Sequence, residues 1–398
     1  MSRRSDDGMF RSLRHRTFRG YFFGSAASVV GTWMQRIGQD WLVLELTGSG
    51  VALGVSTALQ FGPTLVGGLW GGSALDRFPR RTVLLWTQVA SGLVAVGLAV
   101  HTLTGQRDVF SVYALALALG IISVFDYPAR QSIVVELVPE ADVMNAQSLI
   151  STVHNAGRLA GPLLAGALIA GVGVGWTFVA NAASFGAVIF SVRAMPALAP
   201  ARSPDDSRGI LAGLGYVYRR ADLFATIVVV TMVGVFGQNY RVILPLFAQR
   251  SLDGDAQVYA YLTAAMGVGA IVGALANARF GQTSMRGVLF TAALFTGANL
   301  AAAGSRSLVV TLACLAVLGG AYVAFATMAR VYLLVQTPTH LQGRVMALHA
   351  VVFLGPTPIG GPMIGWVCEQ LGPSWGFVTA GITTLAALLF AIGRLIRR

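Results

Sequence analysis

The sequence predicts an all-α integral membrane fold in which twelve transmembrane helices form two pseudo-symmetric bundles of six. Three observations lead to this prediction. The chain of 398 residues is 55% hydrophobic and only 11% charged. It contains about twelve apolar runs of the roughly 20 residues that a helix needs to cross a bilayer core. Its two halves carry the same short motifs in the same order, about 200 residues apart.

The first bundle is expected at 18–195, after an arginine-rich cytoplasmic tail at 1–17. Its apolar runs predict helices at 18–46, 51–74, 82–103, 109–134, 143–170 and 175–194. The tail leads directly into a long apolar run that no small-residue cleavage site follows. The first helix is therefore expected to be an uncleaved signal anchor.

The second bundle is expected at 222–398, after a cytoplasmic linker at 196–221. The linker contains Pro, Ser and Asp and then GILAGLGYVYRR, which predicts a short amphipathic helix at the membrane interface. The apolar runs of this half predict helices at 222–247, 257–278, 285–303, 307–334, 343–369 and 375–394.

The distribution of arginine predicts the orientation. The net charge is +12, but the basic residues lie in short loops between spans, which argues against a nucleic-acid partner. Twenty arginines fall in one set of alternating segments and three, Arg107, Arg250 and Arg306, in the other. The positive-inside rule then places both termini in the cytoplasm of a multi-pass protein of the plasma membrane.

Several classes of chemistry lack a signature in the sequence. Both cysteines, Cys314 and Cys368, lie in apolar spans, so neither a disulfide framework nor a metal site is indicated. We find no nucleophile with a base and no phosphate-binding loop. No cofactor, no catalytic residue and no enzyme activity are expected, and the expected energy source is an ion gradient.

Matched motifs define the internal repeat. Ala129-Arg130 with Val135 and Pro139 corresponds to Ala329-Arg330 with Val335 and Pro338; Gly161-Pro162 corresponds to Gly361-Pro362; Trp176-x-Phe178-Val179 corresponds to Trp375-x-Phe377-Val378; and Gly72, Asp76 and Arg77-Phe78 correspond to Gly273, Asn277 and Arg279-Phe280. This order predicts parallel halves related by an axis along the membrane normal.

The loop between the second and third spans has the pattern G-x-x-x-D-R-x-x-R-R. Together with twelve predicted spans and duplicated halves, this loop resembles the signature of the major facilitator superfamily, and the resemblance covers nearly the whole chain. LTGSGVALG at 46–54, YPARQSIVVELVP at 127–139 and GRLAGPLLAG at 157–166 are similar to the branch of the enterobactin exporter, macrolide efflux proteins and related drug exporters.

The resemblance implies that this loop is a cytoplasmic latch between helices of the two halves, which forms in one conformation and breaks in the other. The implied latch residues are Gly72, Asp76, Arg77, Arg80 and Arg81, with Asp126 as the acid of the fourth helix and Arg130 beside it. Pro79 stands where the family has glycine. Asn277 replaces the acid in the second-half copy, so only one latch is fully charged. The alternative is a basic loop that only sets topology.

Ionisable groups within spans are costly and by default mark a pathway. Arg36 and Asp40 lie four residues apart in the first helix, on one face, where they can pair. A movement that separates the pair would let Asp40 take up a proton. We therefore expect Asp40 and Arg36, with Asp126, to serve proton coupling. The alternative is a static ion pair that only helps packing.

Other polar and aromatic residues of the spans are candidates for a substrate cavity. They are Trp33, Gln39, Arg158, Gln238, Asn239, Tyr240, Arg241, Tyr322 and Phe325. Arg36, Arg130, Arg158 and Arg241 outnumber the carboxylates Asp40 and Asp126, and an excess of guanidinium suits a substrate with carboxylate, catecholate or phosphate groups. His154 is expected to be a satisfied packing histidine, and the alternative is a proton carrier.

These features predict a proton-coupled secondary exporter that works by alternating access on amphipathic small molecules, such as drugs or siderophore-like metabolites. Its expected partners are the small-molecule substrate, protons and membrane lipids, and a monomer is expected. The alternatives are an uptake transporter or lipid flippase of the same fold, and a transport-inactive sensor or scaffold.

Overall fold

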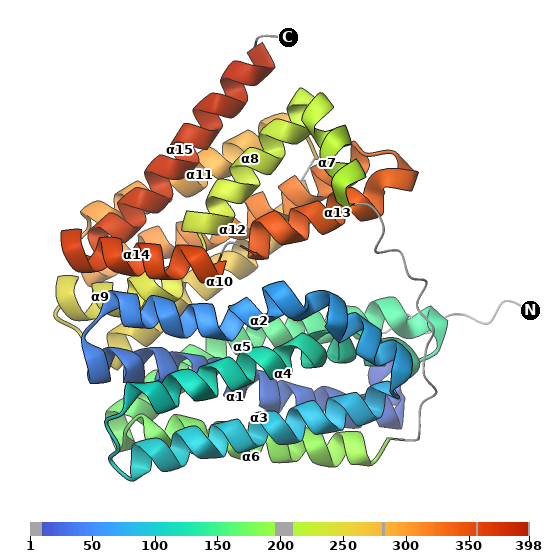
Figure 1. Cartoon of the computed structure of the whole chain (residues 1–398), viewed down its shortest axis with the longest axis vertical. Coiled ribbons are helices and arrows are strands. Elements are labelled where there is room, and N and C mark those ends of the chain that lie inside the picture. The colour runs from blue at the N-terminus through green and yellow to red at the C-terminus, as the bar shows by residue number, and fades with distance from the viewer. Residues whose placement is uncertain (1–9, 196–209, 281–282, 356, 397–398) are drawn as a thin grey trace, which may run out of the picture. The chain divides into compact units, whose positions relative to one another are not determined.

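The computed structural model of the chain is shown in Figure 1. It describes residues 10–195, 210–280, 283–355 and 357–396, without the side chains of residues 68–77, 210–214, 278, 280, 339, 340, 343, 347 and 354. These described residues form helices joined by turns and contain no strand. The prediction of an all-α fold is therefore confirmed.

The chain divides into two compact units. Unit 1 comprises Met1–Gln39 and Val66–Ser203, and unit 2 comprises Asp40–Leu65 and Pro204–Arg398. Unit 2 thus includes a segment of the N-terminal half, namely the end of α1 (Arg16–Thr47) and the first part of α2 (Gly50–Arg77). The predicted division into bundles at 18–195 and 222–398 describes the sequence repeat and stays a prediction.

Unit 1 is built on the helices of the first half. They are η1 (Arg11–Arg14), α3 (Arg80–Leu103), α4 (Val109–Glu136), η2 (Glu140–Asp142), α5 (Val143–Val172) and α6 (Gly175–Arg193), with parts of α1 and α2. Helix α3 packs against α4 and α6 (Figure 1). At one end of the unit, Phe18 and Tyr21 of α1 contact the buried cluster that includes Leu84, Ile133 and Val192.

Helix α4 begins at a capping carboxylate. Asp108 accepts hydrogen bonds from the backbone N–H groups of Phe110 and Ser111, which have no partner within the helix. The Ser111 hydroxyl also donates to Asp108 (2.6 Å). The hydrogen bond from the Ser111 hydroxyl has the largest effect on the pKa of Asp108. Together with the backbone hydrogen bonds, it lowers this pKa below its ordinary value.

Unit 2 contains the helices of the second half. They are α7 (Ile210–Arg219), α8 (Ala221–Phe236), α9 (Tyr240–Ser251), α10 (Ala256–Phe280), α11 (Met285–Gly304), α12 (Leu308–Val335), α13 (Thr339–Leu354), α14 (Thr357–Leu371) and α15 (Ser374–Ile396). Helix α12 packs against α10 and α11, and α15 packs against α8 and α11. Helix α7 occupies the predicted amphipathic segment of the linker.

The internal repeat is visible in the helices. Trp176 is the second residue of α6, and Trp375 is the second residue of α15. Their partners Phe178 and Phe377 are both fully buried, each within its own unit. Equivalent motifs therefore occupy equivalent places in the two halves, as the repeat predicts.

Glycine permits close packing of helices within unit 2. Close packing matters in a membrane because lipid gives no hydrophobic driving force for helices to associate. A Cβ atom on Gly54 of α2 would lie 2.5 Å from the carbonyl oxygen of Gly361 and from the Cα atom of Pro362, both on α14. Gly50 and Gly365 meet in the same way one turn along. A side chain at Gly50, Gly54 or Gly365 would force α2 and α14 apart.

One predicted span is formed by a bent pair of helices. The apolar run 222–247 predicts one helix, but α8 and α9 are bent by 45° across the break after Phe236. Gly237 follows α8, and glycine is one of the residues that most readily interrupt a helix. The run 343–369 contains α13 and α14, which together count as one candidate span.

Nine helical segments of the described residues are long and apolar enough to cross a membrane, or ten when the pair α8 and α9 is counted as one span. Helices α1 and α2 match the two remaining predicted spans. Helix α1 falls outside this selection and carries Arg36, Asp40 and Glu45. The fold is that of a multi-pass membrane protein.

Candidate functional site

The most deeply buried acidic group of the predicted site is Asp40, which lies in unit 2 and is 1% exposed. Arg241 of α9 binds it with two parallel hydrogen bonds, from Nη2 to Oδ1 (2.6 Å) and from Nε to Oδ2 (2.9 Å). The Tyr259 hydroxyl of α10 donates to Oδ2 (3.0 Å). Paired bonds of this kind are the strongest that a guanidinium and a carboxylate form.

Two further side chains complete this cluster, which we call the Asp40 network. Arg241 Nη1 donates to Oε1 of Gln60 on α2 (3.0 Å), and the Arg241 guanidinium lies 5.9 Å from the centre of the Phe61 ring. Tyr259 is fully buried. The network therefore joins α1, α2, α9 and α10 through one charge pair that is withdrawn from water.

The helix break places Arg241. Gln238 Nε2 donates to the carbonyl oxygen of Phe353 (2.6 Å), and Asn239 Nδ2 donates to the carbonyl oxygen of Val235 (2.6 Å). These amides bind carbonyl groups near the interruption, which a membrane requires because no water is present there. Helix α9 then begins at Tyr240, so Arg241 lies in its first turn.

The turn between α1 and α2 is also bound to C-terminal helices of unit 2. Glu369 of α14 accepts hydrogen bonds from the Ser49 hydroxyl (2.8 Å) and the Val51 N–H (3.2 Å). Arg250 at the end of α9 donates to the carbonyl oxygen of Gly48. The Asp40 network therefore holds α1 and α2, and the hydrogen bonds of Glu369 and Arg250 hold the turn between these two helices.

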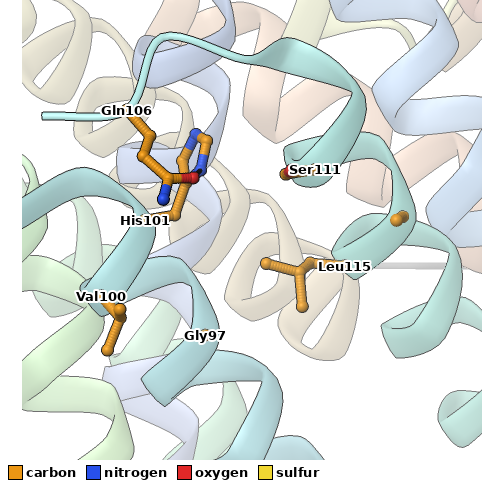
Figure 2. A pocket seen from close by; sticks show the side chains of 7 residues that line it. Gly97, Val100, His101, Gln106, Ser111 and Leu115 are labelled. Carbon is orange, nitrogen blue, oxygen red and sulfur yellow. Dashed lines mark hydrogen bonds between the residues drawn. The ribbon is translucent and has the colours of Figure 1, made fainter. Parts of the chain in front are cut away.

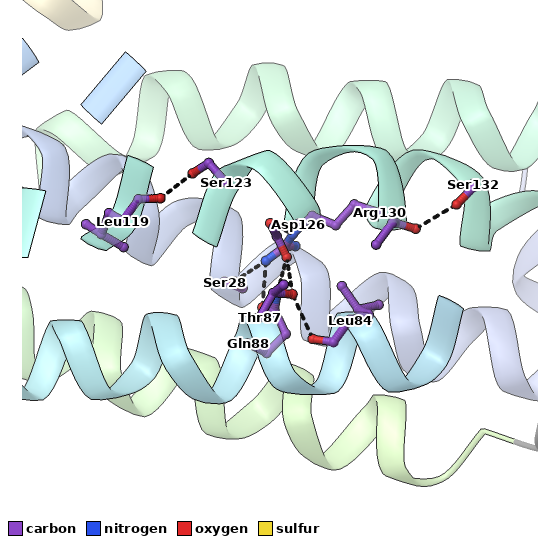
Figure 3. Close-up of polar contacts among 10 residues, drawn as sticks. Ser28, Leu84, Thr87, Gln88, Leu119, Ser123, Asp126, Arg130 and Ser132 are labelled. Carbon is purple, nitrogen blue, oxygen red and sulfur yellow. Dashed lines mark hydrogen bonds and ion pairs between the residues drawn. The ribbon is translucent and has the colours of Figure 1, made fainter. Parts of the chain in front are cut away.

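The second ion pair lies in unit 1, where Asp126 and Arg130 are four residues apart on α4 (Figure 3). Arg130 Nε donates to Asp126 Oδ2 (2.7 Å), and Gln88 Nε2 of α3 donates to Oδ1 (2.5 Å). Thr87 donates to Oδ1 as well (2.8 Å), and Arg130 Nη2 donates to Oε1 of Gln88 (2.6 Å) and to the Ser28 hydroxyl (3.3 Å). Both charges of this pair are thus hydrogen-bonded by polar groups of α1, α3 and α4.

A third cluster in unit 1 is built on Trp33 of α1. The Arg36 guanidinium lies 4.8 Å from the centre of the Trp33 ring, and that of Arg158 on α5 lies 5.6 Å from it. All three side chains are half-buried. Guanidinium groups are attracted to the face of an indole ring, and this attraction holds two cations at one aromatic group.

Comparison with known proteins identifies the family. The model of the transmembrane secretion effector family matches residues 7–397. The chain belongs to this family. Its match spans both units, and it confirms the resemblance to the major facilitator superfamily.

Relatives of the secretion effector family include an exporter of known substrate. The chain is 24% identical over 388 residues to the enterobactin exporter EntS of Escherichia coli O139:H28, and the alignment covers 94% of this chain and 92% of that protein. The enterobactin exporter EntS of Escherichia fergusonii matches with the same identity and coverage.

Solved structures share the fold at low sequence identity. The nucleoside transporter NupG superposes with a TM-score of 0.73 at 12% identity, over 96% of this chain and 98% of that chain. A bacterial homologue of the iron transporter ferroportin, in an inward-facing state, gives 0.71 at 15% identity, over 95% and 98%. These similarities establish a transporter fold of the major facilitator type.

The structure describes only some of the predicted latch residues. The side chains of Asp76 and Arg77, and the surroundings of Gly72, lie outside the described residues. Arg80 forms an ion pair with Glu136 at the end of α4 (2.5 Å), and Arg81 donates to the carbonyl oxygens of residues 192 and 193 at the end of α6 (3.0 and 2.8 Å). Both arginines thus bind within unit 1, and the latch itself stays a prediction.

The remaining predicted cavity residues are mostly internal. Gln39 is 1% exposed, and Phe325 is fully buried in unit 2. Tyr240 is buried and donates to Oδ1 of Asn299 (3.0 Å), whereas Tyr322 is half-buried and stacks on the Phe353 ring. Contact of these side chains with a substrate stays a prediction.

The prediction that His154 is a packing histidine is wrong. The side chain is exposed on α5, and its Nδ1 lies 3.0 Å from the carbonyl oxygen of Ile150. A carbonyl oxygen only accepts, so Nδ1 carries the hydrogen. The other ring nitrogen, Nε2, is then the acceptor of the neutral ring.

A hollow of about 360 Å³ lies between the facing ends of α3 and α4 (Figure 2). Its lining includes Gly97, His101, Gln106, Ser111 and Leu115, none of which is a predicted site residue. His101 is 4% exposed, and its Nδ1 lies 3.2 Å from Oε1 of Gln106. Among the described residues of the whole chain, no group of three His, Cys, Asp or Glu side chains could hold a metal ion.

The structure adds functional candidates that the sequence analysis did not name. They are Gln60 and Tyr259 in the Asp40 network, Gln88 beside Asp126, Glu136 beside Arg80, and Glu369 at the turn between α1 and α2. Gln60 and Gln88 are lone amides within predicted apolar spans, so the cost of a buried polar group could have marked them. Glu136 and Glu369 lie near helix ends and carry no comparable signal.

Proposed function

We propose that the chain is a proton-coupled secondary exporter that works by alternating access, and that Asp40 is the coupling carboxylate. The observation that carries this proposal is the pairing of Asp40 with Arg241 in the interior of unit 2. The pair joins a segment of the N-terminal half to a helix of the C-terminal half. A transporter whose halves separate during its cycle has to break such a pair.

Protonation would act directly on this pair. A neutral carboxylic acid has no charge to attract Arg241 and keeps only part of its capacity to accept hydrogen bonds. Uptake of a proton by Asp40 would therefore release Arg241 and favour the conformation in which α9 has moved away. Arg241 would in turn keep Asp40 ionised whenever the pair is formed. Proton binding and conformation would thus be linked through one contact.

The substrate class follows from the family and the charges. The relative with an assigned substrate exports enterobactin, which favours export of amphipathic small molecules such as siderophore-like metabolites or drugs. Arg36, Arg158 and Arg241 supply the guanidinium groups for anionic parts of such molecules. We further propose a monomer in the plasma membrane with both termini in the cytoplasm, since the arginine distribution predicts that orientation.

The test is transport by purified protein in liposomes with an imposed pH gradient, using a panel of siderophores and of anionic and cationic dyes. We expect gradient-driven accumulation of at least one compound. Asp40→Asn should abolish this accumulation while exchange of the same compound without a gradient continues, because exchange does not require proton release.

The matched control is Asp142→Asn, which also neutralises a carboxylate in an ion pair but lies at η2, outside the predicted spans. It should leave gradient-driven transport unchanged. Full proton-driven transport by Asp40→Asn would refute the role of Asp40. Indifference of the unmodified protein to the gradient across the whole panel would refute proton coupling and favour facilitated transport or a scaffold.

A further inference from the structure

Helix α5 carries a polar face that the proposed transport cycle does not explain. Ser151, His154, Asn155 and Arg158 are spaced i, i+3, i+4 and i+7, so they share one side of the helix. Ser151, His154 and Asn155 are exposed, and Arg158 is half-buried. Arg158 lies near the middle of α5, which is part of a candidate membrane span.

Exposed polar groups at this depth cannot face lipid without a large cost, so this face of α5 has to border water or a ligand. Two of the side chains bind their own helix. Asn155 Nδ2 donates to the carbonyl oxygen of Ser151 (3.0 Å), and the Nδ1 hydrogen of His154 is taken by Ile150. The amide oxygen of Asn155 and Nε2 of His154 are therefore the groups that this face can offer to a ligand.

Arg158 differs from Arg130 and Arg241, two other arginines within the predicted spans. Arg130 and Arg241 each form an ion pair with a carboxylate. Within the described part of the chain, Arg158 has no carboxylate within ion-pair distance, and its contact is the Trp33 ring. An indole face attracts a guanidinium far less than a carboxylate at contact does. A charge placed so deeply without a counter-charge fits an anion that is supplied from outside the chain.

Trp33 defines the second property of that anion. The Arg36 and Arg158 guanidinium groups both lie over its ring, so the cluster presents planar cations beside an aromatic surface. Guanidinium planes stack on aromatic rings and bind carboxylates through paired hydrogen bonds. A ligand with both a flat ring and a carboxylate can use both kinds of contact at once, and an aliphatic anion can use only one.

We propose that Trp33, Arg158 and the polar face of α5 bind a planar aromatic anion. The site rests on the proposed transport function, for which it would supply the substrate class. Arg158 would receive the carboxylate, Trp33 and the guanidinium planes would contact the ring, and His154 and Asn155 would accept hydrogen bonds from hydroxyl groups of the ligand.

The test is direct binding to the purified full chain in detergent, measured by isothermal titration calorimetry. The probes are 2-naphthoate, its neutral amide and cyclohexanecarboxylate. We expect 2-naphthoate to bind about tenfold or more tightly than either of the other two, because each of those lacks one kind of contact. Equal affinity for the three probes, or no binding of 2-naphthoate up to about 1 mM, would overturn the proposal.

Variants locate the site. Arg158→Gln should weaken 2-naphthoate binding about tenfold or more, and Arg158→Lys should weaken it less, because lysine keeps the charge but not the paired geometry. Trp33→Leu should lower the preference for the aromatic over the aliphatic anion. The control is Arg107→Gln, which removes one positive charge from an exposed loop and should leave binding unchanged.

An Arg158→Gln protein that is monodisperse and binds 2-naphthoate as tightly as the unmodified chain would overturn the assignment. Should that variant not fold, Arg158→Lys and Trp33→Leu give the same decision. Binding in detergent needs no gradient, so failure of this test leaves proton coupling at Asp40 intact. Failure of the gradient experiment, in turn, leaves the aromatic anion site intact.

Discussion

The Asp40 network makes a prediction about free energy that is independent of transport. We consider the single changes Asp40→Asn and Arg241→Met and the double change. Arg241→Met removes two hydrogen bonds that Asp40 accepts and keeps the one from Tyr259. Asp40→Asn keeps an oxygen acceptor but leaves the Arg241 guanidinium without its counter-charge. Each single change thus removes one member of an ion pair from an interior where Asp40 is 1% exposed.

The expected magnitudes follow from that burial. Removal of one partner from a buried pair costs about 3–5 kcal/mol of unfolding free energy, because the remaining charge stays desolvated. Removal of both charges leaves no stranded ion, and the cost should fall to about 2 kcal/mol or less, mainly for the hydrogen bonds that Gln60 and Tyr259 lose. The double change should therefore cost less than either single change, with a coupling energy of about 3 kcal/mol or more.

The assay is reversible denaturation of the purified chain by sodium dodecyl sulfate in mixed micelles, with the free energy of unfolding measured for all four proteins. The control cycle uses Arg11 and Asp142, a partly exposed pair at 3.0 Å whose coupling should not exceed about 1 kcal/mol. If the effects of Asp40→Asn and Arg241→Met add within about 0.5 kcal/mol, the contact carries no coupling and the reasoning about the network fails.

Two further predictions concern the segment Asp40–Leu65. Gly54→Ala should destabilise the chain by about 1–3 kcal/mol, because the new Cβ atom would lie 2.5 Å from α14 atoms. The control is Gly62→Ala on the same helix, whose Cβ atom meets nothing within 4 Å and should not destabilise the chain. Equal effects of the two changes in the denaturation assay would contradict the close packing. Glu369→Ala should leave stability within about 1 kcal/mol yet speed amide hydrogen exchange at Val51, whose N–H loses its acceptor; unchanged exchange would show that the turn is held by other groups.

Hydropathy predicted most of the fold, because apolar runs of membrane length and a repeated order of motifs are properties of the sequence itself. It failed where a run continues through a helix break. The residues from 222 to 247 average to one span, although Gly237 to Asn239 interrupt the helix. An average over a window is insensitive to three such residues, although Gln238 and Asn239 bind carbonyl oxygens with their side-chain amides.

The site was predicted less completely, because periodicity reports only on local neighbours. It favoured Arg36 as the partner of Asp40, four residues away, and that pairing stays a prediction. Arg241, which binds Asp40 in the structure, lies 201 residues along the chain. Both residues could be named from the cost of charge in a membrane, but their contact depends on how α1 and α9 pack. Burial cannot be predicted from local periodicity either. Phe325 was a candidate residue of the substrate cavity, and it is fully buried in the core of unit 2.

The ion pairs Asp40–Arg241 and Asp126–Arg130 differ in what a conformational change can do to them. Asp126 and Arg130 belong to one helix, so they move together, and a shift of α4 leaves their 2.7 Å contact unchanged. Asp40 and Arg241 belong to helices remote in sequence, and α9 begins at a break where backbone dihedrals can change without loss of a full helix. A small rotation of α9 about residues 237–239 would separate Arg241 from Asp40. The charge of Asp40 can therefore be coupled to a movement, whereas that of Asp126 is better suited to holding α1, α3 and α4 together.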